Sequence, residues 1–69
     1  MTVEFADALN EVIRELAEEI DWRYEGDDLM AAAPAIRKIE RAVAILRKAS
    51  FEPCQPAVDL LAKYKRRQN

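Results

Sequence analysis

The first 25 residues carry apolar side chains at intervals of three or four positions, namely Phe5, Leu9, Val12, Leu16 and Ile20. This spacing matches the 3.6-residue period of an α-helix and not the alternation of a β-strand. Thr2 is a suitable N-cap for such a helix, and Gly26 can adopt the left-handed conformation that ends one. The pattern therefore predicts a long helix over residues 3–25.

The next apolar series follows a strict alternation of three and four residues. Its members are Leu29, Ala32, Ile36, Ile39, Val43, Leu46 and Ser50. Such a series forms the seam along which one helix packs against another. Because proline is tolerated only in the first turn of a helix, Pro34 places the regular helix over residues 34–49. Residues 28–32 then form either a separate turn or an additional, kinked turn of the same helix.

A third helix is predicted over residues 56–67, after a connector in which Pro53 and Pro56 interrupt the pattern. Its apolar positions are Ala57, Leu60, Leu61 and Tyr64. Acidic Asp59 lies early and basic residues lie late, as the helix dipole favours. The chain is thus predicted to be a single all-α domain over residues 1–69, a long helical hairpin with a short C-terminal helix.

The first helix has a wide apolar face with two edges. One edge holds Phe5, Leu9, Val12 and Leu16, and the other holds Ala6, Ile13, Ala17, Ile20 and Tyr24. Together they span roughly 140°, compared with the ~100° stripe of a typical surface helix. The second helix can cover one edge, and the short third helix can cover part of the other.

A second subunit would cover the remainder and complete a dimeric four-helix-type bundle. A chain of 69 residues is close to the lower limit for an independent core, and one cysteine and no histidine exclude an intrachain disulfide and the common zinc sites. We therefore expect a homodimer, and the alternative is a monomeric three-helix bundle. The residues assigned to the core or dimer interface are Phe5, Leu9, Val12, Ile13, Leu16, Ile20, Ile36, Ile39, Val43 and Leu46.

The charges divide the chain into an acidic and a basic half, although the net charge is only −2. Residues 1–28 carry ten acids and two arginines, a balance of −8, whereas residues 29–69 carry nine basic residues and three acids, a balance of +6. These halves can attract each other within the hairpin or across a dimer.

The basic half also permits a second interpretation, in which Arg37, Lys38, Arg41 and Lys48, with the basic C-terminal residues, contact nucleic-acid phosphates. Against it, the chain is acidic overall, and the joint of about nine residues before Pro34 is too long for the tight turn of a helix-turn-helix. Basic residues near helix ends are also ordinary partners of the helix dipole. Nucleic-acid binding is therefore the less favoured interpretation.

The composition argues against catalysis, metal binding and cofactors. The chain has no histidine to act as a general base, and its single glycine excludes a glycine-rich phosphate loop. Cys54 has no histidine partner, so a buried or idle thiol is the simpler interpretation. Glu11, Glu15, Glu18 and Glu19 lie opposite the apolar arc and face solvent, unlike inward-pointing carboxylate metal sites. We expect no enzyme activity.

The sequence also predicts a cytoplasmic location without membrane insertion. No apolar run approaches the ~20 residues that span a bilayer, and the acidic N-terminus differs from a signal peptide. The single cysteine suits a reducing compartment.

Trp22 departs from the helical pattern, since it continues the outward acidic row of Glu11, Glu15 and Glu18. Tryptophan is the residue type most enriched in binding hot spots, and arginine and tyrosine are also enriched. One hypothesis is that an acidic stripe with an aromatic anchor docks on a basic protein surface, with the contact residues Glu11, Glu15, Glu18, Trp22, Arg23 and Tyr24. The alternative is that the acids are merely solvated and Trp22 folds back over the loop that carries Leu29 and Met30.

The acidic helix FADALNEVIRELAEEIDWRY, the alanine-rich basic helix APAIRKIERAVAILRKA and the 69-residue length resemble small early proteins of temperate bacteriophages that bind host proteins. Among these, the chain is most similar to the phage quorum-sensing anti-activators, and small anti-CRISPR proteins have a similar character. The resemblance covers most of the chain and consists of size and helical character. It implies a helical dimer that inhibits a host transcription regulator, of LuxR type, or other host machinery by stoichiometric binding.

Overall fold

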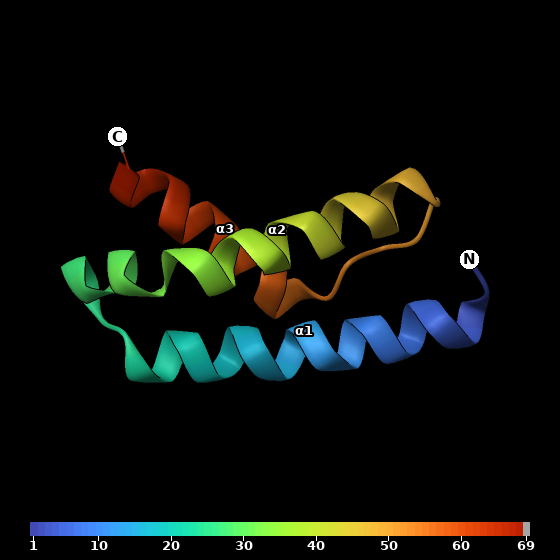
Figure 1. The fold of residues 1–69 in the computed structure, drawn as a ribbon, viewed down its shortest axis with the longest axis horizontal. Coiled ribbons are helices and arrows are strands. Elements are labelled where there is room, and N and C mark those ends of the chain that lie inside the picture. Colours follow the sequence, from blue (N-terminus) through green and yellow to red (C-terminus); the bar gives the residue numbers. More distant parts are fainter. Residues whose placement is uncertain (69) are drawn as a thin grey trace.

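The computed structural model describes residues 1–68 as three α-helices and one 3-10 helix. These are α1 (Val3–Arg23), η1 (Gly26–Ala32), α2 (Ala33–Lys48) and α3 (Gln55–Gln68). The helices α1 and α2 run in opposite directions as a hairpin, and α3 contacts both (Figure 1). The all-α class predicted from the sequence is confirmed, because these residues include no strand.

The helix α1 begins as predicted and ends two residues earlier than predicted. At its start, the side-chain oxygen of Thr2 accepts a hydrogen bond of 3.1 Å from the Phe5 N–H. At its end, Tyr24 and Glu25 are extended, so the helix stops at Arg23. Gly26, with φ of +56°, therefore opens the next element and does not directly cap α1.

The segment before α2 forms a distinct 3-10 helix, η1, which continues directly into α2. Pro34 lies in the first turn of α2, where its missing N–H is not needed. At the other end, Ser50 has φ of +67°, and the Phe51 N–H donates to the Leu46 carbonyl at 2.8 Å. Together with the Ser50 N–H bond to Arg47, this is a Schellman cap, in which glycine is the usual left-handed residue.

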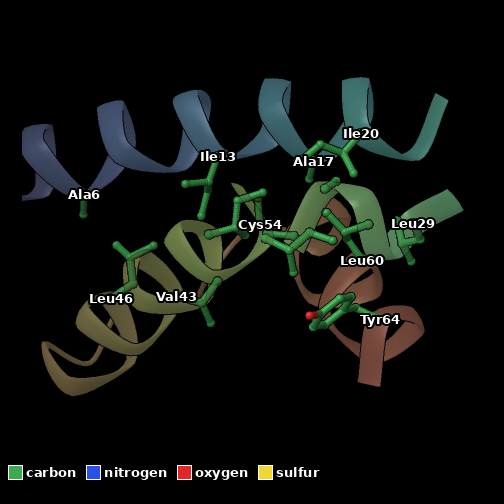
Figure 2. Close-up of a cluster of buried hydrophobic side chains, with 14 residues drawn as sticks. Ala6, Ile13, Ala17, Ile20, Leu29, Val43, Leu46, Cys54, Leu60 and Tyr64 are labelled. Atoms are coloured by element: carbon green, nitrogen blue, oxygen red, sulfur yellow. The ribbon is translucent and has the colours of Figure 1, made fainter. Parts of the chain in front are cut away.

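The core lies where the three helices meet, and Figure 2 shows its side chains pointing toward one another. The predicted seam from Leu29 to Leu46 is buried, whereas Ser50, its last position, is exposed. From α1, only the second apolar edge enters the core. Its buried members are Ala6, Ile13, Ala17 and Ile20, and they meet Cys54, Ala57, Leu60 and Tyr64 on the α3 side.

Asn10 on α1 forms two hydrogen bonds with the connector between α2 and α3. Its Nδ2 donates to the Glu52 carbonyl at 2.9 Å, and its Oδ1 accepts from the Cys54 N–H at 2.8 Å. Cys54 directly precedes α3, and its own carbonyl accepts from Val58 at 3.3 Å in the first turn. Asn10 therefore determines where α3 begins relative to α1.

Candidate interaction surfaces

Trp22 lies in the last turn of α1 with 80% of its surface exposed. It projects from the face of α1 opposite Ala6, Ile13 and Ala17, which enter the core. The alternative in which Trp22 folds back over Leu29 and Met30 is therefore wrong. An exposed tryptophan presents a large apolar area that the fold itself does not use.

The acids predicted to accompany Trp22 are exposed on the same helix. Glu11, Glu15 and Glu18 are solvent-accessible, and among residues 1–68 no ion pair involves them. Successive members are four, three and four residues apart, so they form one stripe that ends at Trp22. We call Glu11, Glu15, Glu18 and Trp22 the acidic stripe.

The other two predicted contact residues lie apart from this stripe. Arg23 is exposed and forms an ion pair with Glu19, with Nε and Oε1 3.2 Å apart. Tyr24 is half-buried and packs against the core. Both border a groove between the end of α1 and the start of α2, which is also lined by Leu16, Ile20, Ala31, Ala32, Pro34 and Ala35. The structure therefore divides the predicted cluster between two surfaces.

The first apolar edge of α1 is left largely uncovered. Phe5, Val12 and Leu16 are 60%, 54% and 42% exposed, and Leu9 is half-buried. Beside them on α2, Ile45 is 50% exposed, and Phe5, Leu9, Ala42 and Ile45 line one shallow depression with Lys38 and Arg41. We call Phe5, Leu9, Val12, Leu16, Ala42 and Ile45 the α1–α2 face.

The ten residues assigned to the core or dimer interface are thus of two kinds. Ile13, Ile20, Ile36, Ile39, Val43 and Leu46 are buried within the single chain. Phe5, Leu9, Val12 and Leu16 belong to the α1–α2 face. The division arises because α2 and α3 both pack mainly on the second edge of α1, so that of the first edge only Leu9 is partly covered.

The opposite charges of the two halves meet partly within the chain. Lys63 on α3 contacts Asp21 on α1, with Nζ and Oδ1 2.8 Å apart. Arg67 contacts Asp27 on η1 at 3.4 Å. Two of the basic residues considered for phosphate binding are therefore already engaged with acids. The basic residues of α2 that were considered, Arg37, Lys38, Arg41 and Lys48, are exposed.

Two further side chains were not singled out from the sequence. Asn10 follows Ala6 by four residues and precedes Ile13 by three, so it lies on the same side of the helix as these buried residues. A polar residue at such a position could have indicated a hydrogen-bonded contact with another segment. Ile45 is the only large apolar residue of α2 that lies outside the buried seam. Its position outside that series could have predicted that its side chain is exposed.

Residues 1–68 contain no group of three or more histidine, cysteine, aspartate or glutamate side chains placed to hold a metal ion. Cys54 is buried, and Figure 2 shows it among the core side chains. Within the same residues, no helix is both long and apolar enough to cross a bilayer.

Comparisons with protein families, with curated proteins and with solved structures gave no match. Function is therefore inferred from the surfaces.

Proposed function

We propose that this protein is a small, non-enzymatic binding domain that acts stoichiometrically on another protein, as an inhibitor or an adaptor. The observation that carries the proposal is Trp22, whose side chain is 80% exposed on an otherwise acidic face. Alanine scans of interfaces find most of the binding energy in a few residues, with tryptophan the most enriched type. Trp22 is the anchor that inserts into an apolar pocket of the partner.

The charges around Trp22 define the chemistry of that partner. Glu11, Glu15 and Glu18 form no ion pair within residues 1–68, so their field is available to an approaching molecule. Exposed charges of this kind mainly accelerate encounter and exclude wrong partners, whereas a buried aromatic residue slows dissociation. The partner surface is therefore a basic rim around an apolar pocket.

The proposal includes a homodimer that forms a four-helix-type bundle. It is supported by the α1–α2 face, where Phe5, Val12 and Ile45 each leave at least half of their surface exposed in the single chain. Small domains commonly obtain part of their stability from a second subunit. The resemblance to phage inhibitors suggests a cytoplasmic host protein, such as a transcription regulator, as the partner.

The anchor is tested with the full-length chain immobilised and used to capture proteins from a cytoplasmic extract of the source cell. A partner bound by the wild type should be lost from Trp22→Ala, while Val3→Ala, which removes a 63% exposed apolar side chain at the other end of α1, should retain it. Because Trp22 is exposed, its replacement should change stability by less than about 0.5 kcal/mol. Unfolding of Trp22→Ala, or undiminished capture, would contradict the proposal.

The alternative, a nucleic-acid-binding regulator, is examined with generic duplex DNA. A protein that works through Trp22 should show negligible binding at physiological salt. Binding that falls steeply with salt and is lost when Arg37, Lys38 and Arg41 are replaced by glutamine would favour the alternative.

A further inference from the structure

We propose that a second copy of this chain covers the α1–α2 face, with α1 of each copy lying against α2 of the other. The two-fold axis runs parallel to the helices. This deepens the dimer of the proposed function by assigning its surface, its arrangement and its charged contacts. It rests on the observation that one face of the hairpin is apolar at its centre and carries opposite charges on its two sides.

The face is a band with three parts. On its α1 side lie the exposed acids Glu15, which lines a depression with Val12, and Glu19, which lines a groove with Leu16. On its α2 side lie the exposed bases Lys38 and Arg41. Between them are the apolar side chains of the α1–α2 face, and Lys38 and Arg41 border the same depression as Phe5. A surface that is acidic along one side and basic along the other is complementary to itself.

This charge pattern selects one of two possible arrangements. A two-fold axis in the interface and perpendicular to the helices places α1 on α1 and α2 on α2, so acids face acids and bases face bases. An axis parallel to the helices exchanges the two sides of the band, so acids of one copy face bases of the other. Like charges placed together cost free energy, and opposite charges steer association, which favours the parallel axis.

The same axis produces a regular helix packing. Since α1 and α2 run in opposite directions within one chain, placing α1 on the second copy's α2 makes every neighbouring pair of helices antiparallel, as in an up-down-up-down bundle. Phe5, Leu9, Val12 and Leu16 are spaced by four, three and four residues, the spacing of an interhelical seam. Ala35, Ala42 and Ala49 repeat every seven residues along α2, and their small side chains allow close approach.

The arrangement also has a consequence for the anchor. Rotation about an axis parallel to the helices does not change a residue's position along that axis. The two copies of α1 therefore point the same way, and both Trp22 side chains lie at the same end of the bundle. The perpendicular axis would place them at opposite ends. The dimer therefore presents two anchors to one side, and a partner with two sites gains avidity from both.

The surface is tested by analytical ultracentrifugation of the full chain from low to high micromolar concentration. The wild type should sediment as a dimer, Val12→Asp and Ile45→Glu should sediment as helical monomers, and the control Trp22→Ala should remain dimeric. Both substituted residues of the face are half-exposed, so the fold tolerates a charge there, which circular dichroism verifies. A wild type that is monomeric throughout, or a dimer that both variants leave intact, would overturn the assignment.

The arrangement is tested by charge exchange at low salt. Glu15→Lys and Lys38→Glu should each raise the dimer dissociation constant by about tenfold, and the double variant should return it close to the wild-type value. A double variant weaker than both single variants would exclude the parallel axis. These results can be told apart from a failure of the Trp22 anchor. A wild-type chain that is monomeric but still captures its partner through Trp22 would contradict only the dimer. A wild-type chain that is dimeric but captures its partner without Trp22 would contradict only the anchor.

Discussion

Replacing Asn10 with alanine should destabilise the protein clearly, although Asn10 is not a buried residue. The substitution removes two hydrogen bonds, from Nδ2 to the Glu52 carbonyl at 2.9 Å and from the Cys54 N–H to Oδ1 at 2.8 Å. Each such bond contributes about 1 kcal/mol net, and leaving the part-buried Cys54 N–H without a partner adds to the loss. We expect a decrease of about 2–3 kcal/mol in the free energy of unfolding.

Thermal and urea denaturation followed by circular dichroism measure this loss. For a domain of this size, each 1 kcal/mol shifts the melting temperature by about 4–8 °C, so a shift of roughly 10–20 °C is expected. The control is Arg14→Ala, which removes an exposed side chain one turn along the same helix and should change stability by less than about 0.5 kcal/mol. A melting temperature for Asn10→Ala equal to that of this control would refute the reasoning.

Asn10→Asp separates the two bonds. The aspartate keeps an acceptor for the Cys54 N–H, but its second oxygen then faces the Glu52 carbonyl oxygen with no proton between them. This repulsion raises the pKa of the introduced carboxyl in the folded state above its value in the unfolded chain. The deficit relative to wild type should therefore be largest at neutral pH and should shrink as pH falls through that pKa, because the protonated carboxyl can donate.

Three further expectations follow from the backbone and from Trp22. Ser50→Gly should stabilise the protein by about 0.5–1 kcal/mol in urea denaturation, because glycine removes the cost of a left-handed residue in the cap of α2; an unchanged midpoint would contradict the strain. Gly26→Ala should destabilise it by about 1 kcal/mol through φ alone, because an added Cβ meets no atom within 4 Å. The fluorescence of Trp22, the only tryptophan, should be quenched by acrylamide almost as efficiently in the folded as in the urea-unfolded protein, and a protected folded state would contradict its exposure.

The sequence predicted the elements of this fold best where one strong periodic signal acted alone. The series from Leu29 to Leu46 is buried at every step, since a strict three–four spacing leaves a helix only one way to face the core. The end of α1 was predicted less well. Gly26 does take the left-handed conformation, but Tyr24 and Glu25 are already extended before it, and periodicity carries no information about such residues.

The candidate surfaces were only partly accessible to sequence reasoning for a different reason. The width of the apolar arc on α1 follows from residue spacing, and so does the outward position of Trp22. Which edge of that arc stays exposed does not, because it depends on the side from which α3 approaches. Spacing within one helix does not determine the packing of another helix 30 or more residues away in the chain.

Polar contacts of α1 and η1 help to hold α3 on that side. Asn10 holds the start of α3, Asp21 pairs with Lys63 near its middle, and Asp27 pairs with Arg67 near its end. All three therefore draw α3 toward the same side of the hairpin, away from Phe5 and Val12. Each exposed ion pair contributes little, about 0–1 kcal/mol, whereas the two-bond contact of Asn10 contributes more. Polar residues outside that edge thus contribute to which apolar edge remains available to another molecule. A change at Asn10 should disturb the α1–α2 face only through the position of α3.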